Sequence, residues 1–229
     1  MTESFRIALA GNPNTGKSTL FNLLTGLKQH TGNWAGKTVN LKTGLFSFKN
    51  NKYEMIDLPG TYSLFSNSMD EKIARDYLVF EKPDVTLVIL DATALERNMN
   101  LALQVMEITD RVIICINLID EAEKLGIEIN DKVLMKRLGV PVIKVSARNK
   151  SGISMLLDTI DRVVSGTILC TPYQVTYDDE TEQKIKLLLP KVLEISGDKF
   201  PARWLSLRML DGDRDLLQMI EMHISKMEV

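Results

Sequence analysis

Short runs of apolar residues alternate along this chain with segments in which apolar residues recur every three or four positions. The runs predict buried strands, and the helical spacing between them predicts amphipathic helices. This alternation is typical of an α/β fold, and we expect a mostly parallel sheet of six strands flanked by helices. The expected strands cover residues 5–10, 38–48, 53–58, 84–91, 112–116 and 140–145.

Two segments depart from simple strand and helix repetition. Asn50 and Asn51 lie between two β-rich runs, which predicts a hairpin and therefore an antiparallel pair of strands. Residues 27–37 have little periodicity and contain Gly32 and Gly36, so we expect a loop there.

The pattern changes after Gly166. Residues 167–178 lack periodicity and predict a linker, and the rest of the chain has helical spacing throughout. Pro190 is expected to kink or break the first of these helices, and Asp213 to cap the last. We therefore expect a first domain over 1–166 and a small helical domain over 167–229 that includes the linker.

Composition limits the classes of function. The 229 residues carry a formal net charge of −2 and no basic block, so nucleic acid is not an expected partner. Only two cysteines are present, which favours a reducing compartment over a disulfide framework. No apolar run approaches the length of a membrane span and the N-terminus lacks a signal-peptide pattern, so the chain as given is expected to be soluble.

The strongest chemical signal follows the first expected strand. Glycines at 11 and 16 allow a tight turn, so that backbone amides and the next helix N-terminus converge on a phosphate group. Lys17 adds a positive charge, and the Ser18 hydroxyl can hold Mg²⁺. The residues expected to bind phosphates are Gly11, Asn12, Pro13, Asn14, Thr15, Gly16, Lys17, Ser18 and Thr19.

An Asp-x-x-Gly sequence, Asp57 to Gly60, directly follows the third expected strand. The Asp57 carboxylate can support Mg²⁺ through water, and the Gly60 amide can sense a γ-phosphate. Alone this sequence is a common turn. After a phosphate-binding loop it becomes a second indication of nucleotide hydrolysis.

Asn117 to Asp120 follow the strand at 112–116. The Asp120 carboxylate can accept hydrogen bonds from the N1–H and amino group of guanine, whereas adenine offers no matching pair of donors. Leu118 replaces the commoner lysine that covers the base, and backbone groups after the strand at 140–145 can contact guanine O6. The residues expected on the guanine side are Asn117, Leu118, Asp120, Ser146, Ala147 and Arg148.

This ordered set of motifs resembles the translation-factor class of GTPases. Residues 11–14, 32–39, 57–64 and 91–98 are similar to the N-terminal cytosolic part of the bacterial ferrous-iron transport protein B family, and residues 200–205 and 210–213 are similar to its helical domain. The resemblance extends over nearly the whole chain. It implies a P-loop GTPase fold, a Ras-like G domain, followed by a small all-helical domain.

The resemblance also implies hydrolysis of GTP to GDP and phosphate, with GTP or GDP and Mg²⁺ as ligands. Ser18 and Thr38 would hold the metal and Asp57 would support its water. The positions implied to be catalytic are Lys17, Thr38, Gly60 and Thr61.

Two further properties are implied by the family. Thr61 stands where Ras-like proteins carry a water-orienting glutamine, so intrinsic hydrolysis should be slow. The family uses K⁺ as an activator, which Asn14 and backbone carbonyls around Gly32 and Trp34 would hold. The cation would neutralise charge that develops in the transition state.

The implied partner is the membrane-embedded transporter domain of the same full-length protein, at the cytoplasmic face of the bacterial inner membrane. The resemblance implies that the helical domain favours GDP binding and connects the nucleotide switches to that membrane part. A homo-oligomer of this chain is also possible. A soluble ribosome-assembly or tRNA-modifying GTPase would share the motifs but lacks support from a basic RNA-binding module. A non-hydrolysing GDP-binding interaction module is the other alternative, and Thr61 favours it.

Overall fold

The computed structural model describes residues 3–26, 29–33, 40–65 and 68–227. Its contacts divide the chain into two compact units, Met1–Tyr173 and Gln174–Val229. The amides of Thr171 and Tyr173 donate to the carbonyls of Gly139 and Leu138 at 2.9 and 2.8 Å. The first part of the expected linker therefore runs along the first unit.

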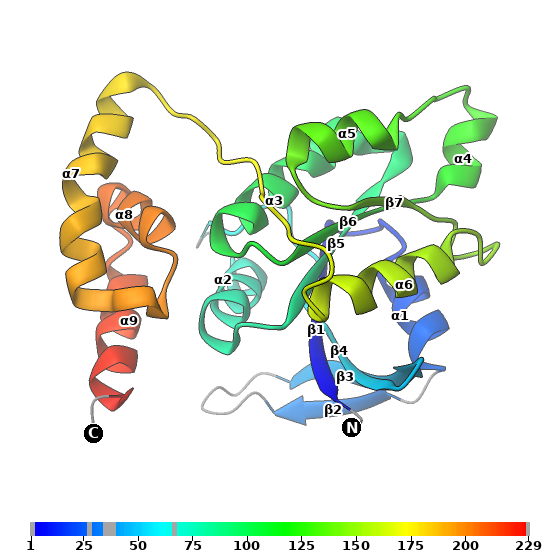
Figure 1. Ribbon diagram of the computed structural model, residues 1–229, viewed down its shortest axis with the longest axis horizontal. Coiled ribbons are helices and arrows are strands. Elements are labelled where there is room, and N and C mark those ends of the chain that lie inside the picture. The colour runs from blue at the N-terminus through cyan, green and yellow to red at the C-terminus, as the bar shows by residue number, and fades with distance from the viewer. Residues whose placement is uncertain (1–2, 27–28, 34–39, 66–67, 228–229) are drawn as a thin grey trace. The chain divides into compact units, whose positions relative to one another are not determined.

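The first unit is built on a seven-stranded sheet in the order β2-β3-β4-β1-β5-β6-β7 (Figure 1). Pairs β1–β4, β1–β5, β5–β6 and β6–β7 are parallel, and pairs β2–β3 and β3–β4 are antiparallel. The expectation of a mostly parallel sheet flanked by helices is confirmed. The strands are β1 (Ser4–Gly11), β2 (Gln29–Asn33), β3 (Asn40–Phe48), β4 (Asn51–Asp57), β5 (Val85–Asp91), β6 (Val112–Asn117) and β7 (Val142–Lys144).

The sheet differs from the sequence-based expectation at its antiparallel edge. Gln29–Asn33 forms strand β2 against β3, in a segment expected to be a loop, and adds a seventh strand to the six expected. Backbone pairing with β3 creates this strand, and such pairing leaves little trace in a polar sequence. The hairpin turn is Lys49–Asn50, one residue earlier than expected, and Lys49 adopts the left-handed conformation with φ of 51°.

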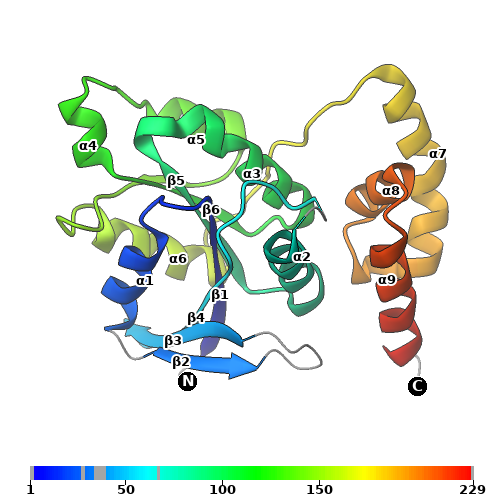
Figure 2. The ribbon, with the colours of Figure 1, turned by 180° about the vertical axis from the view of Figure 1, so that it is seen from behind.

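Helices cover both faces of the sheet (Figures 1 and 2). Apolar residues of α1 and α6 share one core with alternate residues of the central strands, such as Ile7 and Leu9 of β1. Helix α3 contacts β1, β5 and β6 outside this cluster. The helices are α1 (Lys17–Thr25), α2 (Met69–Asp76) with a π-helical continuation (Tyr77–Glu81), α3 (Leu95–Ile108), α4 (Ile119–Lys124), α5 (Asp131–Leu138) and α6 (Ile153–Val164).

Parallel pairing brings the carboxyl ends of four strands to one edge of the sheet. Gly11 ends β1, Asp57 ends β4, Asp91 ends β5 and Asn117 ends β6. The strand order reverses around β1, and ligands of open α/β sheets bind in the crevice at such a switch point. The fold therefore collects the sequence motifs at the edge where a ligand is expected.

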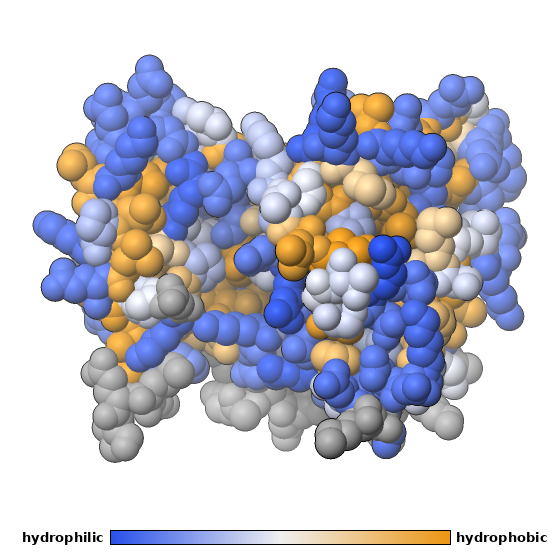
Figure 3. All heavy atoms as spheres, viewed as in Figure 1, coloured by the Kyte–Doolittle hydropathy of each residue, from blue (hydrophilic) through white to orange (hydrophobic). Residues whose placement is uncertain are grey.

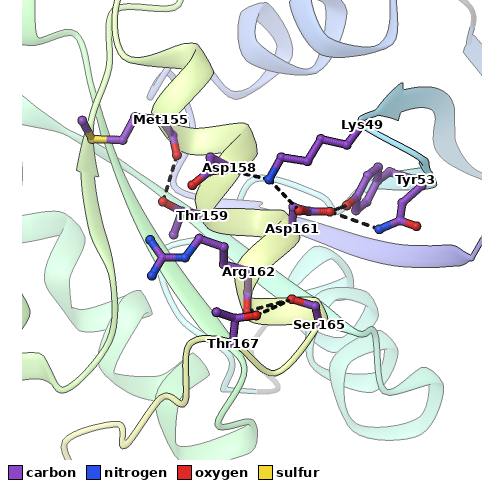
Figure 4. A network of polar contacts seen from close by, with 10 residues as sticks. Lys49, Tyr53, Met155, Asp158, Thr159, Asp161, Arg162, Ser165 and Thr167 are labelled. Carbon is purple, nitrogen blue, oxygen red and sulfur yellow. Dashed lines mark hydrogen bonds and ion pairs between the residues drawn. The ribbon is translucent and has the colours of Figure 1, made fainter.

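A group of polar side chains ties the β3–β4 hairpin to α6 (Figure 4). Asp161 of α6 accepts hydrogen bonds from the Tyr53 hydroxyl at 2.7 Å, from Asn51 Nδ2 at 3.1 Å and from Lys49 Nζ at 2.9 Å. Lys49 also contacts Asp158 at 2.8 Å. Strand β4 ends at Asp57, and α6 follows the loop at 146–148. These contacts therefore connect the elements that carry the residues expected at the phosphates and at the guanine base.

The carboxylate at the centre of this group has an altered pKa. Burial raises the pKa of Asp161, but the hydrogen bonds from Lys49, Tyr53 and Asn51 together outweigh it and lower the pKa. Burial and the Asp161 hydrogen bond raise the pKa of Tyr53 to about 12. The interaction is therefore between a carboxylate and a neutral phenol at physiological pH.

The second unit consists of α7 (Asp179–Ser196), a 3₁₀ turn (Gly197–Lys199), α8 (Ala202–Asp211) and α9 (Arg214–Met227). Pro190 lies inside α7, which continues beyond it and is not broken. Asp213 accepts a hydrogen bond from the Leu216 amide at 3.2 Å and so caps α9 as expected. An Arg203–Glu182 pair joins α8 to α7 at 2.7 Å and lowers the pKa of Glu182 to about 2.

The surface of the second unit carries apolar side chains among charged ones (Figure 3). Leu187 and Ile195 of α7 are 75% and 65% exposed, and Met222 of α9 is 58% exposed. Within the described ranges, every helix is too short or too polar to traverse a bilayer.

We predict that Asp161→Ala lowers the free energy of unfolding by about 2 kcal/mol, because it leaves the partly buried Tyr53 hydroxyl and Asn51 amide unpaired. Asp158→Ala, which loses an ion pair between half-exposed groups, should cost less than about 0.5 kcal/mol. Urea unfolding measures both. Asp161 has a lower pKa in the folded state than in the unfolded state. Its contribution to the free energy of unfolding is therefore present above about pH 4 and is lost as the pH falls through the folded-state pKa. Equal effects of the two substitutions at pH 7 would contradict this assignment.

Candidate nucleotide-binding site

The phosphate-binding loop connects the end of β1 to the start of α1. Gly16 caps α1 in the left-handed conformation with φ of 80°, and Asn14 is also left-handed with φ of 66°. Among the described residues, no side chain caps the α1 N-terminus and no acidic residue lies in its first turn. Its amide groups and positive dipole end are therefore available to an anion.

The residues expected at the phosphates divide into two groups. Pro13, Asn14, Ser18 and Thr19 are exposed, whereas Asn12 and Thr15 are buried. The Asn12 carbonyl accepts from the Thr15 hydroxyl at 3.0 Å, and both polar atoms of the Asn12 side chain are buried without a hydrogen-bond partner in the described structure. Thr15 thus stabilises the loop from inside.

Asn117 joins the phosphate loop to the loop that follows β7. Its Nδ2 donates to the Thr15 carbonyl at 2.9 Å, and its Oδ1 accepts from the Ala147 amide at 3.0 Å. The side chain is 1% exposed. A Cβ atom on Gly16 would lie 2.3 Å from Asn117 Nδ2, so this close approach requires glycine at position 16.

The two oxygens of Asp120 have different environments. Oδ2 accepts from Asn149 Nδ2 at 3.2 Å, whereas Oδ1 is buried and has no hydrogen-bond partner among the residues the structure describes. The nearby Ser146 hydroxyl lowers the pKa of Asp120, so the group is a carboxylate at neutral pH. The site therefore presents a buried, unpaired acceptor with a negative charge.

Asn149 is a further residue of this site that was not among those expected from the sequence. Its amide donates to the Ser146 hydroxyl at 3.2 Å, and its side chain orients Asp120. The Ser-x-x-Asn spacing of Ser146 and Asn149 could have indicated this contact, because it is typical of a turn closed by a serine hydroxyl.

The other residues expected beside guanine are placed as follows. Leu118 precedes α4 in the left-handed conformation with φ of 63°. The Ala147 amide, one of the backbone groups in the loop expected to contact guanine O6, donates to Asn117 Oδ1 here. Arg148 is 77% exposed at its side chain and lies 3.6 Å from Glu121.

On the phosphate side, Lys17 contacts the Asp-x-x-Gly segment. Its Nζ donates to an Asp57 carboxylate oxygen and to the Leu58 carbonyl, the latter at 2.7 Å. The Thr61 amide donates to the Gly11 carbonyl at 3.3 Å, and Thr61 is 4% exposed. The structure thus brings both phosphate-side motifs together, with the lysine bound by protein oxygens.

Three residues expected at the metals belong to the segment that follows α1. Thr38 and Trp34 lie outside the described residues. Gly32 is described through its backbone, which pairs with Leu41 in the β2–β3 ladder.

A phosphate loop after β1, an Asp-x-x-Gly after β4 and an Asn-x-x-Asp after β6 define the P-loop GTPase fold. Residues 5–160 match the family described as ferrous iron transport protein B, and residues 177–228 match the family's cytosolic helical domain. The chain belongs to the ferrous iron transport protein B family.

Individual relatives agree with this placement. The Fe(2+) transporter FeoB of Escherichia coli K12 is 41% identical over 212 residues, which are 90% of this chain and 27% of that protein. A Porphyromonas gingivalis Fe(2+) transport protein A/FeoB fusion protein is 37% identical over 92% of this chain and 26% of its own length. The chain thus spans about a quarter of the length of these relatives.

Solved structures show the same fold. The cytosolic domain of T. maritima FeoB in a GDP form has a TM-score of 0.86 and 35% identity, covering 100% of this chain and 87% of that one. The FeoB G-domain of Methanococcus jannaschii has a TM-score of 0.64 and 48% identity, covering 72% of this chain and 99% of that one.

We predict that Asn117→Ala lowers the free energy of unfolding by about 2 to 3 kcal/mol, because it removes the partners of two buried backbone groups, the Thr15 carbonyl and the Ala147 amide. Asn149→Ala is the matched control, and its exposed side chain should cost less than about 1 kcal/mol. Thermal unfolding without nucleotide measures both changes. A loss for Asn117→Ala no larger than that for the control would show that the bridge does not stabilise the loop.

Proposed function

We propose that this chain binds guanine nucleotides and hydrolyses GTP to GDP and phosphate, as the nucleotide-dependent cytosolic part of a ferrous-iron transporter. The observation that carries the proposal is the buried, unpaired Oδ1 of an ionised Asp120. The GDP-bound T. maritima relative supports it, because that protein shares the fold over the whole of this chain.

Base selection follows from the state of Asp120. Guanine presents N1–H and an exocyclic amino group on one edge, and a carboxylate accepts from both. Adenine would leave a buried charged oxygen without a donor, which is a large penalty. Asn149 holds the other side of the carboxylate and thereby fixes its orientation.

Phosphate binding would use the uncapped N-terminus of α1 and Lys17. Lys17 is bound by Asp57 and Leu58 in this structure, so phosphate oxygens would replace these partners. Ser18 and Asp57 offer the hard oxygen donors that Mg²⁺ prefers, and Thr38 is the further hydroxyl we assign to it. When bound, Mg²⁺ would neutralise charge on the β- and γ-phosphate oxygens.

Hydrolysis would depend on positioning. We assign Gly60 the role of donating its amide to the γ-phosphate, and its neighbour Thr61 is buried and provides no glutamine-like group to orient water. A slow intrinsic rate follows. K⁺ bound by the exposed Asn14, with the carbonyls around Gly32 and Trp34, would supply the missing positive charge.

The partner we propose for the helical unit is the membrane-embedded part of the full-length protein at the cytoplasmic face of the membrane. The relatives named as Fe(2+) transporters are about four times as long as the aligned region. The exposed Leu187 and Ile195 on α7 offer apolar area for such a contact. Ferrous iron is cargo of the transporter in this proposal and not a ligand of the present chain.

Calorimetry with Mg²⁺ tests the base assignment. The native chain should bind GDP and show at least about tenfold weaker binding of ADP, because adenine leaves the Asp120 carboxylate unpaired. Asp120→Asn should lose GDP affinity by about ten- to hundredfold and prefer xanthosine diphosphate, whose O2 carbonyl accepts from the new amide. Asp131→Asn on α5 controls for the lost charge and should bind GDP normally. Equal GDP and ADP binding by the native chain would refute the proposal.

Comparison of K⁺ with Na⁺ tests the cation. GTP turnover of the native chain should be at least about tenfold faster in K⁺, as expected for a charge placed at the transition state. Asn14→Ala should abolish this difference. If turnover of the native chain is equal in the two salts, the proposed K⁺ site is wrong.

A further inference from the structure

Helix α3 presents a polar stripe made of Arg97, Asn100 and Gln104. These residues are spaced three and four positions apart and therefore share one face of the helix. The face with Leu101 and Val105 is fully buried. A helix anchored by its apolar face in this way is a firm support for whatever contacts its polar face.

The stripe contacts the segment that follows Asp-x-x-Gly. Gln104 Oε1 accepts from the Leu64 amide at 2.6 Å, and Gln104 Nε2 donates to Asn100 Oδ1 at 3.4 Å. The Arg97 guanidinium lies 4.8 Å from the centre of the Tyr62 ring, within the range of a cation–π interaction. Tyr62 is 47% exposed, so burial fixes its ring only in part and the Arg97 contact adds to it.

The start of α3 is itself fixed to the sheet. Asn98 Oδ1 accepts from the Asp91 amide at the end of β5, at 3.2 Å, and Asn98 Nδ2 donates to the Ala94 carbonyl at 2.9 Å. By contrast, residues 58–65 form neither a helix nor a strand. A conformational change that separates residues 58–65 from α3 would therefore move residues 58–65 and leave α3 in place.

The segment is also held at its other end. Lys17 donates to Asp57 and Leu58, and the Thr61 amide donates to the Gly11 carbonyl. In the conformation that the α3 stripe contacts, the lysine is therefore occupied by protein oxygens. Phosphate of either nucleotide would release Lys17, but only GTP would also draw the Gly60 amide toward a γ-phosphate.

We propose that Arg97 and Gln104 are positioning residues that hold residues 61–64 against α3. They thereby oppose the movement of Gly60 toward a γ-phosphate and weaken binding of GTP relative to GDP. This inference rests on the proposed guanine-nucleotide function. A ligand shifts a conformational equilibrium only by its differential affinity for the two conformations. Contacts that stabilise one conformation therefore weaken the binding of a ligand that requires the other conformation. GDP lacks the γ-phosphate and does not need the displacement.

The test measures dissociation constants of fluorescent GDP and of a fluorescent non-hydrolysable GTP analogue, with Mg²⁺, for the whole chain. Gln104→Leu removes the acceptor of the Leu64 amide, and Arg97→Met removes the cation while keeping an unbranched side chain. Each should increase GTP-analogue affinity relative to GDP by about threefold. Gln104→Glu keeps an acceptor oxygen and should retain the native ratio. Lys136→Met, an exposed position on α5, controls for the lost positive charge.

A double-mutant cycle with Arg97→Met and Tyr62→Leu isolates the ring contact. If the pair acts as proposed, the doubly substituted chain shows the same ratio as either single variant, so the effects are not additive. An unchanged ratio in both Gln104→Leu and Arg97→Met, or a decreased one, overturns the inference. Failure of the native chain to bind either nucleotide would instead refute the proposed function, so the two failures are distinguishable.

Discussion

The side chain of Asn117 holds the two halves of the site together. It contacts the Thr15 carbonyl in the phosphate loop and the Ala147 amide in the loop after β7, two segments that are far apart in sequence. The side chain also lies so close to the backbone of Gly16 that a Cβ atom there would be 2.3 Å from Asn117 Nδ2. Because a buried amide must satisfy both its donor and its acceptor, this contact sets the separation between the loop after β1 and the loop after β7.

The segment from Asp57 to Leu64 lies between two sets of partners. Lys17 and Gly11 contact its beginning, and its end contacts α3 through Gln104 and α2 through Glu71. Each contact is worth on the order of 1 kcal/mol, which is small against the binding energy of a nucleotide. Such a balance suits a switch, because a ligand can reverse it without disturbing the sheet that supports both sides.

Several elements were predictable because local chemistry determines them. The apolar runs that became β5 and β6 and the Asp213 cap of α9 behave as their sequences predict. Strand β2 was not predictable, since its polar residues gain their conformation from pairing with β3. The uninterrupted course of α7 through Pro190 was also not predictable from local helix propensity. Packing of the turns on either side of the proline outweighs the one hydrogen bond that it removes.

By itself, the sequence predicted the mostly parallel sheet, the glycine-rich loop after the first strand, the acidic residue that we propose for the base and the family resemblance, because each depends on residue types at short, fixed spacings. Only the tertiary structure decided that Asn149 orients Asp120, that the Ala147 amide is used by Asn117, and that Arg97 and Gln104 contact residues 62 and 64. These contacts join residues whose separation along the chain carries no periodic signal. They exist because parallel strands bring their carboxyl ends to one edge, where the loops that follow them meet.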